Sequence, residues 1–337
     1  MAPKRFIVYG AGAIGGVLGS LLHRAGHEVV LIARGPHLEA IRAQGLRLVT
    51  AEGDQVVRVP ALAGPHELEH RPGDVVLLAM KSMDTEAALR ALAPVVAPET
   101  PIVCVQNGVA NERAALRLFP HVYGVCVMFP ATHLEPGVVQ AGSWPVPALL
   151  DIGRYQGDTG RVPPDETAAE VAAAFRSTGC HSEPRPDIMR WKYRKLVMNL
   201  GNAVDALVGR AEGAADVTEA IRVEGERVLE AAGIPVASRE EDRARRGDIL
   251  RLRPIEGRPR GGSSSWQSLA RGTGSIEADY LNGEIVLLGR LHGVEAPLNE
   301  AVRRLAVRFA REGRPPGSMP VEELRVALDR AAENASS

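Results

Sequence analysis

The first half of the chain alternates between short apolar runs and longer segments with helical periodicity. The apolar runs, which have the length and composition of buried strands, lie at 6–9, 27–33, 74–80 and 101–105. The helical segments lie at 14–25, 38–44 and 84–92. Near-continuous apolar runs are typical of parallel strands that are covered on both faces. The alternation therefore predicts a doubly wound parallel sheet, the core of an α/β Rossmann-like domain.

Between 122 and 152 the pattern changes to short apolar runs that prolines and glycines separate. We expect antiparallel strands that finish the sheet there, followed by an amphipathic helix at 167–177. A proline-rich stretch at 183–186 then interrupts the periodicity, because proline resists a continuing helix. We therefore expect a dinucleotide-binding domain at 1–184.

From 185 to 337 the pattern is helical almost throughout, which predicts an all-α C-terminal domain. Helical periodicity recurs at 187–208, 216–232, 277–292 and 298–311. The exception is 239–262, where many arginines occur together with prolines and glycines. We expect a loop or mobile segment there, with its charge solvated, and fraying over the last ten or so residues.

A glycine-rich turn joins the first strand to the first helix, in the pattern G-x-G-x-x-G. In such a turn the first glycine permits a tight bend, the second lets the backbone approach a pyrophosphate, and the third lets helix and strand pack closely. The positive end of the helix then faces the phosphates. A glycine-rich turn of some other α/β protein is the alternative, but the strand and helix around it favour dinucleotide binding. The candidate cofactor-binding residues are Gly10, Ala11, Gly12, Ala13, Ile14 and Gly15.

The second strand ends in Arg34, where NAD-binding domains usually carry an acidic residue that accepts from the ribose 2′-OH. An arginine there suits a 2′-phosphate by its charge and planar donor fork, although a solvated surface arginine is the simpler alternative. We therefore expect NADP(H) as the cofactor. Lys81 and Asn107 follow two other predicted strands, so we expect both to face the crevice beyond the carboxyl ends of the strands.

Lys195, Asn199 and Asn202 form a polar group in a helical segment whose apolar side consists of Leu196, Val197 and Leu200. Their spacing of i, i+4 and i+7 places them on one face of a helix. One interpretation is a polar stripe that faces solvent. The other is the wall of a pocket, in which Lys195 donates a proton and the two asparagines hydrogen-bond a substrate.

A serine-rich turn and a glutamate lie further along the chain. The serines at 263–265 precede a helical segment, so some of them can cap that helix. They can equally hold a carboxylate at its N-terminus. Glu277 begins the next helix, where it can simply complement the helix dipole.

Composition narrows the functional classes. A net charge of -1 offers no basic surface to nucleic acid or to an anionic membrane, and 4% aromatic residues are too few for a base-stacking platform. The three cysteines are widely spaced without a CxxC pattern, so we expect neither a metal site nor a disulfide framework. No apolar run reaches the roughly 18 residues that a membrane span needs. The N-terminal residues do not resemble a signal peptide, so we expect a cytoplasmic protein.

In combination these motifs resemble the ketopantoate reductase (2-dehydropantoate 2-reductase) family over nearly the whole chain. The matching features are the glycine turn, Arg34, Lys81, Gln106-Asn107-Gly108, Lys195 with Asn199, the serine-rich turn, and Glu277-Ala278-Asp279-Tyr280-Leu281-Asn282-Gly283. The resemblance implies a Rossmann domain, a helical C-terminal domain, and NADPH-dependent reduction of a 2-oxo acid, foremost 2-dehydropantoate to pantoate.

The resemblance also implies roles for individual residues. Lys195 corresponds to the catalytic lysine and Glu277 to a substrate-binding glutamate. Asn199 and Ser265 correspond to further substrate-binding positions. Lys81 and Asn107 would line the nicotinamide site.

The chain departs from the family pattern where the substrate is expected. Ala203 takes the place of a second asparagine, which is shifted here to Asn202. Trp266 replaces a methionine and Leu269 an aspartate, which predicts a less polar surface. Two alternatives follow: a family member that reduces a bulkier 2-oxo acid, ketone or imine, and a non-catalytic protein that senses NADP(H). The apolar helical faces of the C-terminal domain are also consistent with a homodimer.

Overall fold

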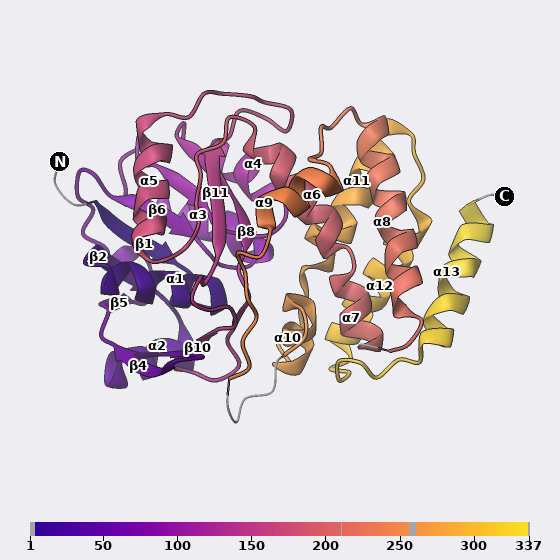
Figure 1. Cartoon of the computed structure of the whole chain (residues 1–337), viewed down its shortest axis with the longest axis horizontal. Coiled ribbons are helices and arrows are strands. Elements are labelled where there is room, and N and C mark those ends of the chain that lie inside the picture. The colour runs from indigo at the N-terminus through magenta and orange to yellow at the C-terminus, as the bar shows by residue number, and fades with distance from the viewer. Residues whose placement is uncertain (1–3, 210, 256–260, 336–337) are drawn as a thin grey trace. The chain divides into compact units, whose positions relative to one another are not determined.

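The computed structural model describes residues 4–209, 211–255 and 261–335. These residues form two compact units (Figure 1). The first contains the described residues up to Lys192 together with 238–255, and the second contains 193–237 together with those from Gly261 onward. The first unit is built on strands and the second on helices, so the predicted α/β and all-α architecture is confirmed.

The main sheet of the first unit has seven strands in the order β11-β8-β7-β6-β1-β2-β5. Their bounds are β1 Arg5–Tyr9, β2 Glu28–Ile32, β5 Ala61–Leu62, β6 Val75–Leu78, β7 Ile102–Cys104, β8 Val122–Met128 and β11 Leu149–Arg154. All neighbours run parallel except β11, which is antiparallel to β8. The order reverses at β1, which lies between β2 and β6, and such a switch point is where dinucleotides bind.

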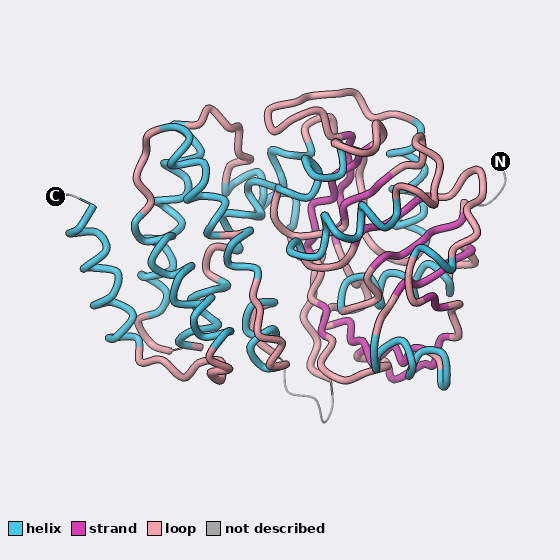
Figure 2. The backbone as a smooth tube through the Cα atoms, turned by 180° about the vertical axis from the view of Figure 1, so that it is seen from behind, coloured by secondary structure: helices cyan, strands magenta, loops and turns pink. Residues whose placement is uncertain are grey.

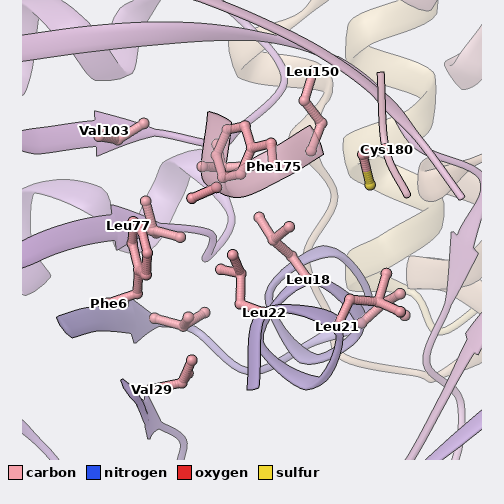
Figure 3. Packing of buried hydrophobic residues seen from close by; sticks show 14 of the residues in the cluster. Phe6, Leu18, Leu21, Leu22, Val29, Leu77, Val103, Leu150, Phe175 and Cys180 are labelled. Carbon is pink, nitrogen blue, oxygen red and sulfur yellow. The ribbon is translucent and has the colours of Figure 1, made fainter. Parts of the chain in front are cut away.

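Helices complete the hydrophobic core of this unit. Helix α1 (Ala13–Arg24) packs on β1 and β2, and α5 (Glu166–Ser177) packs on β11. Figure 3 shows the core between the sheet and these helices, where Phe6, Leu77, Leu22 and Phe175 meet. Elsewhere in the unit lie α2 (Gly35–Gln44), α3 (Thr85–Leu92), α4 (Ala110–Leu116) and the 3-10 turns η1 (Pro65–Glu67) and η2 (Ser82–Asp84).

The prediction that 122–152 only adds antiparallel strands to the sheet is wrong in two respects. Strand β8 pairs in parallel with β7, and all seven of its residues are buried because it lies between β7 and β11. Strands β9 (Ala131–Thr132) and β10 (Val138–Ala141) join a separate four-stranded sheet in the order β4-β3-β10-β9. Its other members are β3 (Leu46–Thr50) and β4 (Gly53–Val57).

The segment at 239–262 also differs from its prediction. Residues 239–246 form a helix, α9 (Arg239–Arg246), which a capping box between Ser238 and Glu241 begins. Arg245 is no solvated charge: it donates to both oxygens of the buried Asp151 carboxylate, at 2.7 and 2.8 Å. The part of the prediction that concerns 256–260 lies outside the described residues.

This contact changes the expected domain boundary. Backbone hydrogen bonds join Trp144 to Arg251 and Arg253 to Gly142, so 238–255 belongs to the first unit. The chain first passes from the first unit to the second after Lys192, inside the continuous helix α6 (Ile188–Asn199). The expected boundary was at Pro184.

The second unit consists of helices and loops in its described part (Figure 2). After the end of α6 come α7 (Asn202–Val208), α8 (Ala214–Ala231), α10 (Ser264–Ala270), η3 (Glu277–Tyr280), α11 (Asn282–His292), α12 (Pro297–Arg311) and α13 (Val321–Ala335). A buried polar cluster joins three of them, because Asn299 bonds to Glu224, Asn282 and the Ile221 carbonyl. Of the helices that the structure describes, none is long and apolar enough to cross a membrane.

Candidate functional site

The glycine turn lies at the switch point of the main sheet. Gly10 has φ +101°, and a Cβ there would lie 2.6 Å from the Met80 nitrogen, so the bend requires glycine. A Cβ on Gly15 would collide with the Gly10 carbonyl. Gly12 caps α1, and a Cβ there would meet nothing within 4 Å. The turn is therefore tight against the sheet and open at the helix N-terminus, which fits an approaching pyrophosphate.

The other candidates in the turn lie beside these glycines. Ala11 is buried, with its backbone N–H donating to Ile32 O. Ala13 and Ile14 form the first turn of α1 and are partly exposed. Backbone N–H groups in a first helical turn point along the helix axis, where an anion would lie.

His37 holds this turn in place, and the sequence interpretation did not include it. The backbone N–H of Gly137 donates to His37 Nδ1 at 2.9 Å, so the ring carries its proton on Nε2. That nitrogen donates to the Ala11 carbonyl at 2.7 Å. Burial lowers the pKa of His37, which favours the neutral ring that the bond from Gly137 requires.

Arg34 lies after β2, as expected from the sequence, and is the N-cap residue of α2. Its guanidinium is 82% exposed and donates to Asp84 Oδ2 at 3.0 Å. Asp84 ends η2, the short turn after β6, and it was not a sequence candidate. The arginine is therefore accessible to an anion, but a carboxylate already competes for it.

Lys81 and Asn107 follow β6 and β7 and are both partly exposed. A buried hydrogen-bond network joins the two turns that carry them. The side-chain amide of Gln106 donates to Met80 O at 2.8 Å and to Thr85 Oγ1 at 2.9 Å. The turns after both strands are thus fixed relative to each other, as a site at this sheet edge requires.

Asn111 extends the network from its position in α4. The Thr85 hydroxyl donates to Asn111 Oδ1 at 2.9 Å. The amide nitrogen of Asn111 donates to the Asn107 carbonyl at 3.1 Å and to Ser82 Oγ at 3.2 Å. A side-chain hydrogen bond from Asn111 therefore holds the backbone of Asn107.

A buried ion pair lies under the same turn. Lys192 Nζ is 2.9 Å from Glu112 Oε1, and the two side chains are 2% and 0% exposed. The ammonium also donates to Gln106 O at 2.9 Å and to Val125 O at 3.1 Å. Burial raises the pKa of Glu112, and the charge of Lys192 opposes that shift.

Sequence reasoning missed this pair. The available signal was that Lys192 stands four residues after Ile188 and four before Leu196, on a face of α6 that is buried. A lysine on an apolar helical face needs a buried partner. Nothing local points to Glu112 as that partner, because it lies in a different helix, far away in the sequence.

In the second unit, Lys195 and Asn199 occupy the last two turns of α6, one turn apart. Lys195 is partly exposed and Asn199 is buried. The expectation that Asn202 shares their helical face is wrong, because α6 ends at Asn199 and Asn202 begins α7. Gly201 lies at the break, where a Cβ would be 2.6 Å from Thr218 Cγ2.

Asn202 instead contacts the serine-rich turn. Its carbonyl accepts from Ser263 Oγ at 3.2 Å, and its side-chain amide is 3.5 Å from Ser264 Oγ. Ser263 Oγ also accepts from the Trp266 N–H, which makes it the N-cap of α10. Asp205 fixes the turn by accepting from the Ser263 N–H at 2.7 Å.

Ser265 differs from its neighbours in this turn. It is 2% exposed, and its hydroxyl has no hydrogen-bond partner among the described residues. A buried hydroxyl without a partner costs free energy and marks a position where a ligand atom can supply the missing bond.

Leu269 and Trp266, which were both expected to make the surface less polar, differ in their exposure. Leu269 is buried, so it does not supply the less polar surface that its identity suggested. Trp266 is partly exposed and packs on Gly262, so it can. Glu277 begins η3 and is partly exposed. Burial lowers the pKa of Arg271, and the charge of Glu277 opposes that shift.

Comparisons with known proteins agree with this arrangement. Residues 6–155 match the family model "Ketopantoate reductase PanE/ApbA", and residues 187–308 match its C-terminal counterpart. The 2-dehydropantoate 2-reductase of Halobacterium salinarum is 31% identical over 323 residues, covering 92% of this chain and 100% of that protein.

Solved structures show the same similarity. A PanE/ApbA family ketopantoate reductase from Ralstonia eutropha is 31% identical with a TM-score of 0.75, over 92% of this chain and 100% of the other. D-mandelate dehydrogenase, solved with NADH and anilino(oxo)acetate, has a TM-score of 0.77 at 22% identity, over 92% of this chain and 99% of the other. At that identity the second likeness concerns the fold alone.

Proposed function

Because the chain belongs to the ketopantoate reductase PanE/ApbA family of oxidoreductases, we propose that it reduces a 2-oxo acid to a 2-hydroxy acid with NADPH, preferring 2-dehydropantoate. The observation that carries this proposal is the pair formed by Lys195 and Asn199. A partly exposed lysine lies one helical turn from a buried asparagine, in the last two turns of α6. An ammonium beside an amide provides the donors that a ketone oxygen and its neighbouring carboxylate need.

In the proposed reaction, bound NADPH supplies the hydride that adds to the carbonyl carbon. The Lys195 ammonium hydrogen-bonds the carbonyl oxygen and transfers a proton to it as negative charge develops there. Asn199, Asn202 and the Ser265 hydroxyl would orient the substrate, with Ser265 gaining the partner that it lacks. Glu277 would accept from a substrate hydroxyl.

The cofactor preference rests on Arg34. Its exposed guanidinium directly follows β2, where the adenosine ribose of a dinucleotide lies in Rossmann-like domains. The glycine turn would bind the pyrophosphate, and Lys81 and Asn107 would contact the nicotinamide side.

A substrate panel with both NADPH and NADH tests the proposal. We expect the highest kcat/KM for 2-dehydropantoate with NADPH. Turnover of this substrate with NADH alone would contradict the cofactor assignment. A much higher kcat/KM for another 2-oxo acid, a ketone or an imine would support the alternative that Trp266 favours, a site adapted to a bulkier substrate.

A non-catalytic NADP(H) sensor is the less favoured function. Such a protein needs the glycine turn and Arg34 but has no need for Lys195 and Glu277 together. Tight NADPH binding by calorimetry, combined with no turnover across the whole panel, would support it.

We also propose a homodimer. Leu287 and Leu291 are exposed one turn apart on α11, at 44% and 66%. Neighbouring exposed leucines are typical of a subunit interface. Light scattering should give twice the chain mass of 36.0 kDa, and Leu291→Lys should reduce it to that of one chain.

A further inference from the structure

The Lys192 ammonium lies close to three oxygen atoms, one of the Glu112 carboxylate and two of backbone carbonyls. Besides the carboxylate, Lys192 Nζ binds the carbonyl of Gln106, at the end of β7, and that of Val125, within β8. Gln106 and Asn107 share a peptide bond, so a constraint on the Gln106 carbonyl orients the plane that leads directly into Asn107.

Stability alone does not account for such a pair. Removing two charges from water costs several kcal/mol per ion, and apolar replacements of a whole buried pair are often neutral or stabilising. Gly124 of β8 lies directly against the pair, because a Cβ there would be 3.1 Å from Lys192 Cδ and 3.2 Å from Glu112 Oε1. The pair is therefore closely fitted into the sheet edge that carries the candidate nicotinamide residues.

We propose that Lys192 and Glu112 are positioning residues that fix the Gln106–Asn107 peptide and thereby aim the Asn107 side chain at the nicotinamide. Glu112 holds the ammonium in place, and the ammonium holds the turn. This inference rests on the proposed function, since it assigns Asn107 to the nicotinamide side.

The test uses the double variant Lys192→Met/Glu112→Leu, which removes both charges and leaves neither partner unpaired. The matched control is Arg5→Met/Asp74→Leu. That buried pair, with Arg5 Nη2 2.7 Å from Asp74 Oδ2, lies at the amino ends of β1 and β6, the opposite edge of the sheet. If they fold, the single variants Lys192→Met and Glu112→Gln separate the role of the ammonium, which holds the turn, from that of the carboxylate, which holds the ammonium.

Affinities for NADPH and for 2′,5′-ADP, which lacks the nicotinamide, give a readout that general destabilisation cannot mimic. A displacement of about 1 Å at a reacting group can cost on the order of 10²-fold in rate, so we expect kcat to fall by about that factor in the Lys192/Glu112 double variant. NADPH should bind more weakly and its bound fluorescence should change. Affinity for 2′,5′-ADP should stay unchanged, and the control should alter none of these quantities.

Two outcomes would overturn the inference. One is a folded Lys192/Glu112 double variant with wild-type kcat and wild-type NADPH affinity. The other is an equal loss of affinity for NADPH and 2′,5′-ADP. If the wild type binds NADPH but reduces no substrate, the proposed function fails while the ratio of the two affinities still tests the positioning pair.

Discussion

Arg34 donates to Asp84 across 3.0 Å, so the arginine expected to meet a 2′-phosphate already binds a carboxylate. The affinity for NADPH is then a competition, because the phosphate must displace this partner or tolerate its charge nearby. We expect Asp84→Asn to tighten NADPH binding by roughly 2- to 5-fold, the range of an exposed ion pair.

Arg34→Ala should have the opposite effect. Loss of a charge-assisted bond to the phosphate should weaken NADPH binding about 10- to 100-fold and leave NADH binding nearly unchanged. Calorimetry with both cofactors measures the ratio of the NADPH and NADH affinities. Arg42→Ala is the control, since Arg42 lies within α2 and forms another exposed ion pair, with Glu67 of η1. Equal losses for NADPH and NADH would argue against the assignment.

Lys195→Ala tests the proton donor. Loss of a general acid should lower kcat by about 10²- to 10⁴-fold. NADPH affinity, measured by fluorescence, should not change, because the lysine is assigned to the substrate and not to the cofactor. An unchanged turnover number would refute the role.

Ser265→Ala should separate function from stability. Its hydroxyl has no partner among the described residues, so its removal should change the free energy of unfolding by less than about 0.5 kcal/mol. The KM for the substrate should rise about 10-fold if the hydroxyl binds it. Ser263→Ala should give the reverse pattern, because loss of this N-cap costs about 1 kcal/mol of stability. Equal KM values for Ser265→Ala and wild type would exclude the contact.

His37 predicts a dependence of stability on pH. Its pKa is lowered in the folded state, below the ordinary 6.5, so the unfolded chain takes up the proton first as the pH falls. The effect is absent well above pH 6.5 and grows below it, because protonated Nδ1 cannot accept from Gly137.

We therefore expect Tm to decrease between pH 7.5 and 5.5, and NADPH affinity with it, because the ring that loses its bond from Gly137 is the one that holds the Ala11 carbonyl of the glycine turn. The variant His37→Gln should show a smaller decrease over this interval. Burial also lowers the pKa of His27, but that residue is present in both proteins and cancels in the comparison. Parallel pH profiles for the two proteins would contradict the prediction.

The features that the sequence predicted well are encoded locally. Parallel strands such as β6 are continuous apolar runs, and the turn from Gly10 to Gly15 has its own spacing. The pairing of β10 with β3 depends on residues far apart in the chain, so no local pattern announces the second sheet. The break after Asn199 was missed for the same reason, because the close contact of Gly201 is with Thr218, in another helix.

The candidate site shows the same division. The motif residues Lys81, Asn107 and Lys195 could be named from their positions at strand ends and in a helix. The residues that hold the turns of the site, such as His37 and Lys192, act through bonds to distant backbone carbonyls. Those partnerships exist only once the chain has folded.

Residues 238–255 belong to the first unit although they follow part of the second unit in the sequence, and this order has a consequence for protein synthesis. A nascent chain that has emerged only as far as Lys192 lacks α9, and Asp151 then has Arg185 but not Arg245 as a partner. Domains generally fold as units during translation, but here the strand-based unit cannot be completed until much of the helical unit has been translated. A ribosome pause near residue 192 would therefore leave an unfinished α/β fold, and a fragment that ends there should be less stable than the same unit in the full chain.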